Sequence, residues 1–411
     1  MTLAANRIVV GGAELTWDDL PGLGLPSPAA VLVESGADAL AAVREHALRG
    51  TELLVAAASR IDEGLREELR ADGFAVVRPG GEPLAPTSRR EPEPDRLWLL
   101  TSGSTGRPKR IGHTLGSLTT VRGPQAPRVW LCPYSPGTYA WWQVVTLSLT
   151  QPGQDIVVIE PAELEIWPGI AAAHGVTAAS GTPTFWRQAI YRDLQALTQV
   201  PLAQITLGGE PVDQAILDQL RGIFPTTRIS WIYASSEVGA SIVVHDGRAG
   251  FPREWLDRSA PDRPTISVDG DELVITSPFH GAGLDGPVHT GDRVEIVDDR
   301  VVITGRLDSD EINVGGSKIS AGVVRNVLQS HPAVAWARVT SRRSPLVGRM
   351  VVAEVVLTAE ARSTGAGNGT APVDNAALVG WCATRLPDYG VPRLIRFLDE
   401  IPAKETLKSD V

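Results

Sequence analysis

The chain carries the stretch Leu99-Leu100-Thr101-Ser102-Gly103-Ser104-Thr105-Gly106-Arg107-Pro108-Lys109, in which an apolar run leads into hydroxyl residues and glycines. Glycine lets the backbone adopt positive φ and approach a ligand, while hydroxyl and N–H groups bind an anion to which a lysine adds charge. The composition predicts a loop that holds phosphate. It is not a Walker A loop, because Gly103 and Gly106 stand three positions apart and Lys109 follows a proline. A Ser/Gly-rich surface loop is the alternative explanation.

This loop resembles the signature of the acyl-adenylate-forming (AMP-binding) superfamily, which includes acyl-CoA synthetases, peptide-synthetase adenylation domains and firefly luciferase. The signature places hydroxyl residues and glycines before T-G-x-P-K, and every position fits. The resemblance implies a catalytic role for Thr101. It also implies that the β- and γ-phosphates of ATP are bound by Ser102, Gly103, Ser104, Thr105, Gly106 and Lys109.

Bulk properties exclude several classes of function. A length of 411 residues exceeds what one hydrophobic core usually spans, so two domains are expected. A net charge of −10 argues against nucleic acid as the main partner. Two cysteines and no metal-ligand spacing of the histidines argue against a transition-metal site. Neither a leader nor a membrane-length apolar run is found, which predicts a cytoplasmic location without membrane contact.

The order of apolar and amphipathic runs predicts an α/β fold. Strands and helices alternate up to about residue 240, which is typical of a mostly parallel sheet flanked by helices; one of these helices is expected over 161–174. The pattern then changes to a β-rich subdomain, with a hairpin around Asp298-Asp299-Arg300. We predict a large N-terminal domain over 1–305 and a small, mobile α+β C-terminal domain over 306–411.

Two further motifs follow in the order that the superfamily requires. Leu207-Gly208-Gly209-Glu210-Pro211 follows a strand and precedes a helix, and alone it is equally well a structural turn. In the resembling enzymes this turn, with Gly208, Gly209 and Glu210, lies against the adenine.

The second motif is Tyr233-Ala234-Ser235-Ser236-Glu237. An aromatic ring can stack on adenine, and a hydroxyl with a carboxylate suits Mg²⁺, which prefers oxygen ligands. The resemblance assigns nucleotide binding to Tyr233 and Ala234, catalysis to Ser236 and catalysis with metal binding to Glu237. A buried tyrosine with a helix-capping serine is the alternative.

Two motifs near the domain boundary complete the predicted nucleotide site. His289-Thr290-Gly291-Asp292 resembles a motif whose aspartate accepts from both ribose hydroxyls. The stretch Gly305–Ile319 resembles the motif that follows it in the family. Arg306 would also reach the ribose, Asp308 would be the hinge, and Gly316 would lie in a loop that enters the active site in a second step.

The C-terminal tail contains the predicted catalytic lysine, Lys408. It stands in Ile401-Pro402-Ala403-Lys404-Glu405-Thr406-Leu407-Lys408, which has the family's spacing but leucine in place of a glycine. A solvated lysine in a tail is the alternative. The resemblance implies that Lys408 bridges the carboxylate and the α-phosphate as an acyl-adenylate forms.

The resemblance implies ATP, Mg²⁺ and either coenzyme A or the phosphopantetheine of an acyl carrier protein as cofactors and partners. The carboxylic acid pocket is expected around Tyr134, Tyr139, Ser180 and Gly181; Trp141 and Trp142 are at least as well explained as core residues. Two alternatives stay open. One is adenylation followed by transfer to an amine, and the other is a degenerate homologue that binds nucleotide without turnover.

Overall fold

The computed structural model describes residues 3–101, 108–121, 123–260, 263–284, 286–307, 310–314, 316–344, 348–363 and 373–402. The predicted phosphate-loop residues Ser102–Gly106, the predicted hinge Asp308 and the predicted lysine Lys408 lie outside these ranges. None of the described helices is both long and apolar enough to cross a bilayer.

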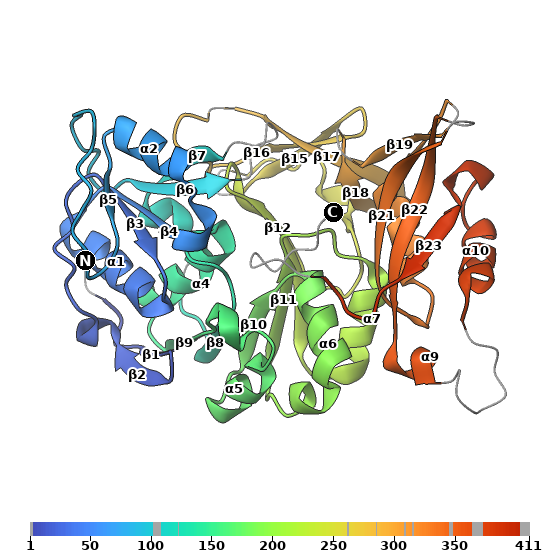
Figure 1. Cartoon of the computed structure of the whole chain (residues 1–411), viewed down its shortest axis with the longest axis horizontal. Coiled ribbons are helices and arrows are strands. Elements are labelled where there is room, and N and C mark those ends of the chain that lie inside the picture. The colour runs from blue at the N-terminus through green and yellow to red at the C-terminus, as the bar shows by residue number, and fades with distance from the viewer. Residues whose placement is uncertain are drawn as a thin grey trace.

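An eight-stranded sheet forms the centre of the large N-terminal unit (Figure 1). Its order is β13-β12-β11-β10-β8-β9-β1-β2, and β12, β11, β10, β8, β9 and β1 run parallel. Runs such as Ile205–Leu207 are fully buried, as expected for parallel strands covered on both faces. The strands are β1 (Arg7–Val10), β2 (Ala13–Thr16), β8 (Arg128–Cys132), β9 (Gln154–Val158), β10 (Ala178–Gly181), β11 (Gln204–Gly208), β12 (Arg228–Ser235) and β13 (Gly239–Val244).

A second, five-stranded sheet has the order β5-β3-β4-β6-β7 and is parallel except for β7. Helix α1 (Gly36–Arg49) packs on β3 and β4 and helix α4 (Tyr139–Thr150) on β8 and β9, within one shared hydrophobic core. Trp141 and Trp142 of α4 are fully buried in this core, so packing explains them. The strands are β3 (Ala29–Val33), β4 (Leu53–Ala57), β5 (Ala75–Val77), β6 (Leu97–Thr101) and β7 (Lys109–His113).

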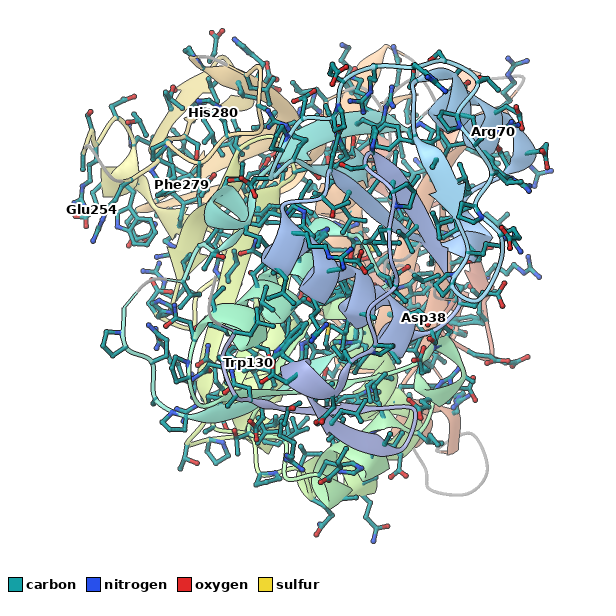
Figure 2. The ribbon with its side chains drawn as sticks, turned by 90° about the vertical axis from the view of Figure 1, so that its left-hand side faces the viewer. Asp38, Arg70, Trp130, Glu254, Phe279 and His280 are labelled. Carbon is teal, nitrogen blue, oxygen red and sulfur yellow. The ribbon has the colours of Figure 1, made fainter. Side chains whose placement is uncertain are left out.

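The β-rich part is a five-stranded antiparallel sheet in the order β14-β18-β17-β16-β15. Val297 pairs with Arg300, so the predicted hairpin turns at Asp298-Asp299, where Asp298 has a φ of 53°. Figure 2 shows Phe279 and His280 on the side of the molecule that carries this sheet. The strands are β14 (Phe251–Pro252), β15 (Thr265–Asp269), β16 (Glu272–Thr276), β17 (Val288–Val297) and β18 (Arg300–Arg306).

The C-terminal unit has its own hydrophobic core, formed only by residues from Ile312 onward. Figure 1 shows the elements of this unit in orange and red. A two-stranded hairpin of β19 and β20 precedes the three-stranded sheet β21-β22-β23, and helices α8 and α10 pack against each other beside it. The elements are β19 (Glu311–Val314), β20 (Ser317–Ser320), α8 (Ala321–Gln329), β21 (Val334–Ser344), β22 (Gly348–Leu357), α9 (Ala359–Ser363), α10 (Asn375–Ala383) and β23 (Leu394–Phe397).

The remaining helices lie in the large unit, and one sequence prediction about them is wrong. The helix expected over 161–174 is a 3₁₀ turn, Pro161–Glu163, followed by a separate α5 (Trp167–Ala173). Pro168 explains the break, because a proline has no N–H to bond the carbonyl of Leu164 four residues earlier and its ring clashes with that carbonyl, whereas a proline in the first turn of a helix is tolerated. The others are α2 (Glu63–Ala71), α3 (Leu115–Leu118), α6 (Pro183–Thr198) and α7 (Gln214–Ile223).

Candidate active site

The predicted phosphate loop connects two paired strands. Strands β6 and β7 are antiparallel, and their register places Thr101 opposite Lys109. The Thr101 hydroxyl donates to the Lys109 carbonyl at the long distance of 3.5 Å, and the Lys109 side chain is exposed. The two described ends of the predicted loop are therefore held together as neighbours.

Three parallel strands bring the next predicted residues to one edge. Gly181 at the end of β10 pairs with Leu207 of β11, and Gly208 pairs with Ile232 of β12. Because parallel strands end at the same side of a sheet, Ser180, Gly208 and Tyr233 become neighbours at this edge, which we call the carboxyl edge. Ligands of α/β folds bind outside the carboxyl ends of strands.

The turn after β11 has little room for side chains. A Cβ atom on Gly208 would lie 3.0 Å from the Ile232 carbonyl oxygen, and Gly209 has a φ of 80°. Glycine alone adopts that φ without strain. The Glu210 carboxylate accepts a hydrogen bond from the Thr184 N–H at 3.0 Å. It thus satisfies a backbone donor in the first turn of α6.

Tyr233, Asp292 and Arg306 form a hydrogen-bonded network. The Tyr233 hydroxyl donates to Asp292 Oδ2 at 2.6 Å, and Arg306 Nη1 donates to Asp292 Oδ1 at 3.1 Å. Asp292 and Arg306 are cross-strand partners in β17 and β18. Burial raises the pKa of Asp292 above its ordinary value, which the bonds from Tyr233 and Arg306 oppose, and burial also raises the pKa of Tyr233. A carboxylate oxygen holds two lone pairs, so Asp292 keeps acceptor capacity for a further ligand.

The turn of Ser236 and Glu237 is held from two sides. His113 Nε2 donates to the Ser236 carbonyl at 2.8 Å, and the Gly281 N–H donates to the Glu237 carbonyl at 2.8 Å. Since a carbonyl only accepts, His113 carries its proton on Nε2, and its Nδ1 lies 3.0 Å from the Ser117 hydroxyl oxygen. Burial lowers the pKa of His113, which favours this neutral form.

His113 was missed by the sequence analysis. It ends β7 and thereby links the predicted phosphate loop to the turn after β12. A lone histidine gives no sequence signal, because Ser236 follows 123 positions later.

Only some of the residues predicted to form the acid pocket are neighbours in the structure. Tyr134 Oη and Ser180 Oγ are 2.8 Å apart. Gly181 is needed for packing, because a Cβ atom there would lie 2.3 Å from the Phe185 ring. Tyr139 lies farther along, with its ring centroid 6.2 Å from that of His113, and a Cβ atom on Gly239 would be 3.4 Å from its hydroxyl.

Comparison with known families identifies the family of the chain. The family described as AMP-binding enzyme matches residues 21–284, and the AMP-binding enzyme C-terminal domain matches residues 324–408. The chain belongs to the AMP-binding enzyme family.

Curated relatives of this AMP-binding enzyme share about a quarter of its residues. It is 26% identical over 368 residues to 4-hydroxybutyrate–CoA ligase 1 of Metallosphaera sedula, covering 77% of this chain and 62% of the relative. It is also 26% identical over 427 residues to feruloyl-CoA synthase of an Amycolatopsis species, covering 92% and 79%. The chain spans 50% to 62% of the length of several curated relatives.

Solved structures share the fold of this AMP-binding enzyme. The anthranilate CoA ligase AuaEII with anthranoyl-AMP has a TM-score of 0.71 at 17% identity, covering 98% of this chain and 92% of that one. The o-succinylbenzoate CoA synthetase of Bacillus subtilis with ATP and magnesium has a TM-score of 0.67 at 19% identity, covering 99% and 95%. At these identities the likeness concerns the α/β fold alone.

Glu237 fits a magnesium ion in this AMP-binding enzyme. Its carboxylate forms no hydrogen bond or ion pair with another described side chain, although its backbone is fixed as above. No three His, Cys, Asp or Glu side chains of the described residues gather into a metal site. Mg²⁺ commonly takes one or two carboxylates and completes its shell with water and substrate phosphates, so a single Glu237 is sufficient.

Arg306 and Asp310 contact each other where the two units of this AMP-binding enzyme meet. The Asp310 carboxylate accepts from the Arg306 N–H at 2.8 Å, and a Cβ atom on Gly305 would lie 2.3 Å from it. Gly316, predicted to enter the site in a second step, lies in the β19–β20 hairpin with a φ of 92°. Arg293 Nη2 of β17 is 3.0 Å from Glu311 of β19, which ties this hairpin to the β-rich sheet.

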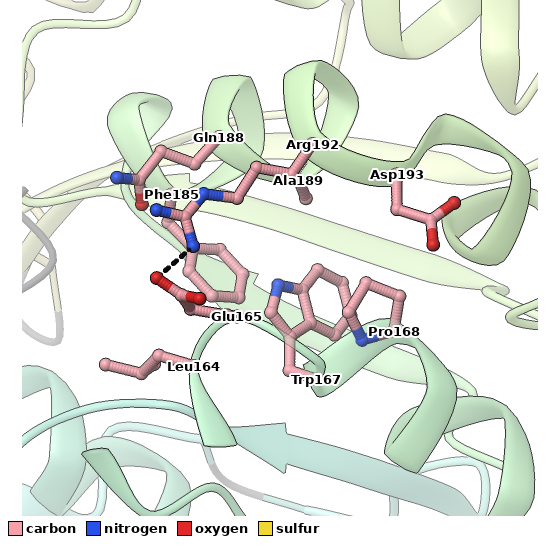
Figure 3. A pocket seen from close by; sticks show the side chains of 9 residues that line it. All are labelled: Leu164, Glu165, Trp167, Pro168, Phe185, Gln188, Ala189, Arg192 and Asp193. Carbon is pink, nitrogen blue, oxygen red and sulfur yellow. Dashed lines mark ion pairs between the residues drawn. The ribbon is translucent and has the colours of Figure 1, made fainter. Parts of the chain in front are cut away.

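Helix α6 of this AMP-binding enzyme carries the contact with the segment that precedes Lys408. Gln188 Nε2 donates to the Ile401 carbonyl at 3.1 Å, and the Tyr191 hydroxyl donates to the Asp399 carbonyl at 2.5 Å. The Arg362 guanidinium lies 4.9 Å from the centre of the Tyr191 ring. Figure 3 shows the neighbouring pocket, where Arg192 pairs with Glu165 at 2.6 Å; it has room for one water molecule at most.

Proposed function

We propose that this chain activates a carboxylic acid with ATP as an acyl-adenylate, releases pyrophosphate, and transfers the acyl group to a thiol. The observation that carries the proposal is the Tyr233–Asp292–Arg306 network at the carboxyl edge, beside the Glu237 turn and the strand pair that bears the predicted phosphate loop. A nucleotide bound there would present its ribose to Asp292 and Arg306. The cofactors proposed are ATP and Mg²⁺.

In the first step a carboxylate oxygen attacks the α-phosphorus of ATP, and the bond from that phosphorus to the bridging oxygen of pyrophosphate breaks. The chain's task is to neutralise charge and to hold the reacting atoms in line. Residues Ser102–Gly106 and Lys109 would hold the β- and γ-phosphates, with Thr101 at the base of their loop. A magnesium ion held by Glu237, beside Ser236, would supply charge to the phosphates. Lys408 would stabilise the charge that develops between the carboxylate and the α-phosphate.

In the second step a thiol sulfur attacks the acyl carbon; the carbon–sulfur bond forms, AMP leaves with the electrons of the broken carbon–oxygen bond, and the thiol proton is released. The proposed acceptor is coenzyme A or the phosphopantetheine of a carrier protein. We propose that the C-terminal unit rotates about Asp308 between the steps, so that the hairpin with Gly316 replaces Lys408.

Pyrophosphate release with Mg-ATP across aryl, short-chain and medium-chain acids tests the proposal, with hydroxylamine added to trap the adenylate. Release with a few related acids is expected. A folded protein that binds ATP but releases no pyrophosphate with any acid would contradict turnover and favour a nucleotide-binding homologue. Release that stops at the adenylate with thiols, yet yields an amide with amines, would overturn only the acceptor.

A further inference from the structure

One arginine of the C-terminal unit is buried where that unit meets the large unit. Arg325 lies on helix α8 and is 8% exposed. Gly322 stands three positions earlier on the same helix face, and a Cβ atom there would lie 1.7 Å from the Thr304 carbonyl oxygen of β18. Arg325 therefore faces the large unit, whereas Val324 and Leu328 belong to the core of its own unit. Charged side chains are rarely buried to this extent unless they are paired.

The charges around Arg325 come from α6, from the turn after β11 and from the chain between the two units. Burial lowers the pKa of Arg325, and three nearby carboxylates oppose that shift. They belong to Glu210, Asp213 and Asp310. Arg187 also lies nearby and pairs with Asp213 at 2.9 Å. Among the described residues, this junction cluster sets two arginines against three carboxylates, so the loss of Arg325 would leave buried negative charge without compensation.

Two of these carboxylates belong to parts of the chain that the proposed first step uses. Glu210 lies in the turn expected against the adenine, and its carboxylate accepts from the Thr184 N–H at 3.0 Å. The Asp310 carboxylate accepts from the Arg306 N–H at 2.8 Å, and Arg306 is part of the proposed ribose site. Arg325 therefore joins helix α8 to two segments that border the proposed nucleotide site.

The C-terminal unit has, in this structure, the placement that we assign to the first step. Gln188 of α6 donates to the Ile401 carbonyl at 3.1 Å, so the segment that precedes Lys408 contacts the large unit. The proposed rotation about Asp308 would carry α8 away from the turn after β11 and expose Arg325 to water. The buried contacts of Arg325 would then exist in only one of the two placements.

We propose that Arg325 is a positioning residue, which holds the C-terminal unit in the first-step placement through Glu210 and Asp310. This rests on the proposed function. An arginine suits this position because its guanidinium stays charged and can donate to two carboxylates at once. In this role Arg325 contacts no substrate; it shifts the population of one placement by binding partners that the other placement lacks.

The first test measures the placement of the C-terminal unit without turnover. Spin labels are attached to cysteines introduced at two exposed positions, Gln219 on α7 and Gly380 on α10 (Gln219→Cys, Gly380→Cys), and their distance is measured in the full chain by pulsed electron paramagnetic resonance. The native Cys132 and Cys382 are buried and stay unlabelled. Arg325→Met is expected to enrich a second distance about 10-fold relative to the wild type, as for a lost charge-assisted contact.

The second test compares the two half-reactions. Arg325→Met should lower the kcat of pyrophosphate release at least about 10-fold, with a smaller change in the KM for ATP. Consumption of a chemically prepared acyl-adenylate by a thiol should be much less affected. Arg325→Lys keeps the charge and should recover part of the loss. Arg338→Met is the matched control, because Arg338 is half-buried and pairs with Glu354 of the same unit at 2.9 Å; it should match the wild type in both tests.

An unchanged distance distribution in Arg325→Met would overturn the proposal, and so would equal slowing of both half-reactions. Should Arg325→Met fail to fold, Glu210→Gln tests the same contact from the large unit and should enrich the same second distance; an unchanged distribution there would also overturn the proposal. Failure of the proposed function has a different signature, namely no pyrophosphate release by the wild type with any acid, and the distance measurement does not depend on it.

Discussion

The proposed nucleotide site depends most directly on Asp292. This residue already accepts hydrogen bonds from Tyr233 and Arg306, and it is largely buried in a protein where most other acidic side chains face solvent. Its place on β17, directly across from Arg306 on β18, fixes both partners through the strand register. A ribose would therefore meet a carboxylate whose orientation is set in advance.

Asp292→Asn is expected to weaken ATP binding about 10- to 100-fold, because one charge-assisted acceptor is lost at the same size and shape. Calorimetric titration with Mg-ATP measures the effect. Asp299→Asn is the control, since Asp299 pairs with Arg248 at 2.8 Å in an exposed pair of similar chemistry away from the site. If both variants bind ATP equally well, Asp292 does not contact the nucleotide.

Buried histidines predict how stability depends on pH. Burial lowers the pKa of His46 and His113 below the ordinary value of 6.5. Below pH 6.5 the unfolded chain therefore binds more protons at these positions than the folded chain does. The contribution of these histidines to the free energy of unfolding is fully present above pH 6.5 and is lost as the pH falls towards the folded pKa values. Thermal unfolding midpoints between pH 7.5 and 5 should decline, and His46→Gln should reduce the slope. An unchanged slope would show that His46 does not contribute.

At the scale of elements, one glycine controls how helix α8 docks. A Cβ atom on Gly322 would lie 1.7 Å from the Thr304 carbonyl oxygen of β18, closer than any packing allows. The Ser320 hydroxyl donates to the same carbonyl at 3.1 Å. The first turn of α8 therefore touches the backbone of β18 directly.

Gly322→Ala is expected to destabilise the protein by about 2 kcal/mol or more, since the helix must shift away from β18. Gly380→Ala in the exposed middle of α10 is the matched control, because no atom lies within 4 Å of a Cβ there. It should be neutral or stabilising by up to about 1 kcal/mol. Urea unfolding followed by tryptophan fluorescence distinguishes the two; equal stability would contradict the close contact.

The elements also show what a sequence can foretell. The βαβ alternation, the turn at Asp298-Asp299 and the order of the motifs are local patterns, and they predicted the α/β class and the family. The break before α5 depends on Pro168, a local signal that could have been read from the sequence. The contact between His113 and Ser236 joins residues far apart in the chain, so no local pattern could indicate it. The roles of Lys408 and Asp308 stay predictions.

At the scale of the whole molecule, helix α6 holds the last described segment of the chain. Tyr191 and Gln188 bind the carbonyl groups of Asp399 and Ile401, and buried Trp336 and Ile401 pack with Tyr191. Only seven positions separate Ile401 from Lys408, so an extended chain reaches at most about 25 Å beyond this contact. The start of α6 adjoins Gly181 at the carboxyl edge.

Replacing both anchoring residues (Gln188→Leu, Tyr191→Leu) is expected to slow pyrophosphate release at least about 10-fold, because the loss of two hydrogen bonds releases the segment before Lys408. Consumption of a chemically prepared acyl-adenylate by a thiol should be much less affected. Leu194→Ala serves as the control, since Leu194 is 45% exposed and lies just beyond the kink of α6 at Asp193. Equal slowing of both half-reactions would show that the contact does not serve adenylation specifically.

The contact with α6 has a consequence for engineering by recombination. Because the C-terminal unit has a core of its own, it is a natural choice for exchange with the corresponding unit of a relative. Two of the side chains that receive it, Gln188 and Tyr191, are nevertheless encoded more than a hundred codons upstream, in helix α6 of the large unit. A chimera joined at residue 305 would receive a new C-terminal unit without the α6 side chains that bind it. A chimera that also takes this face of α6 from the same relative would have both parts of the contact.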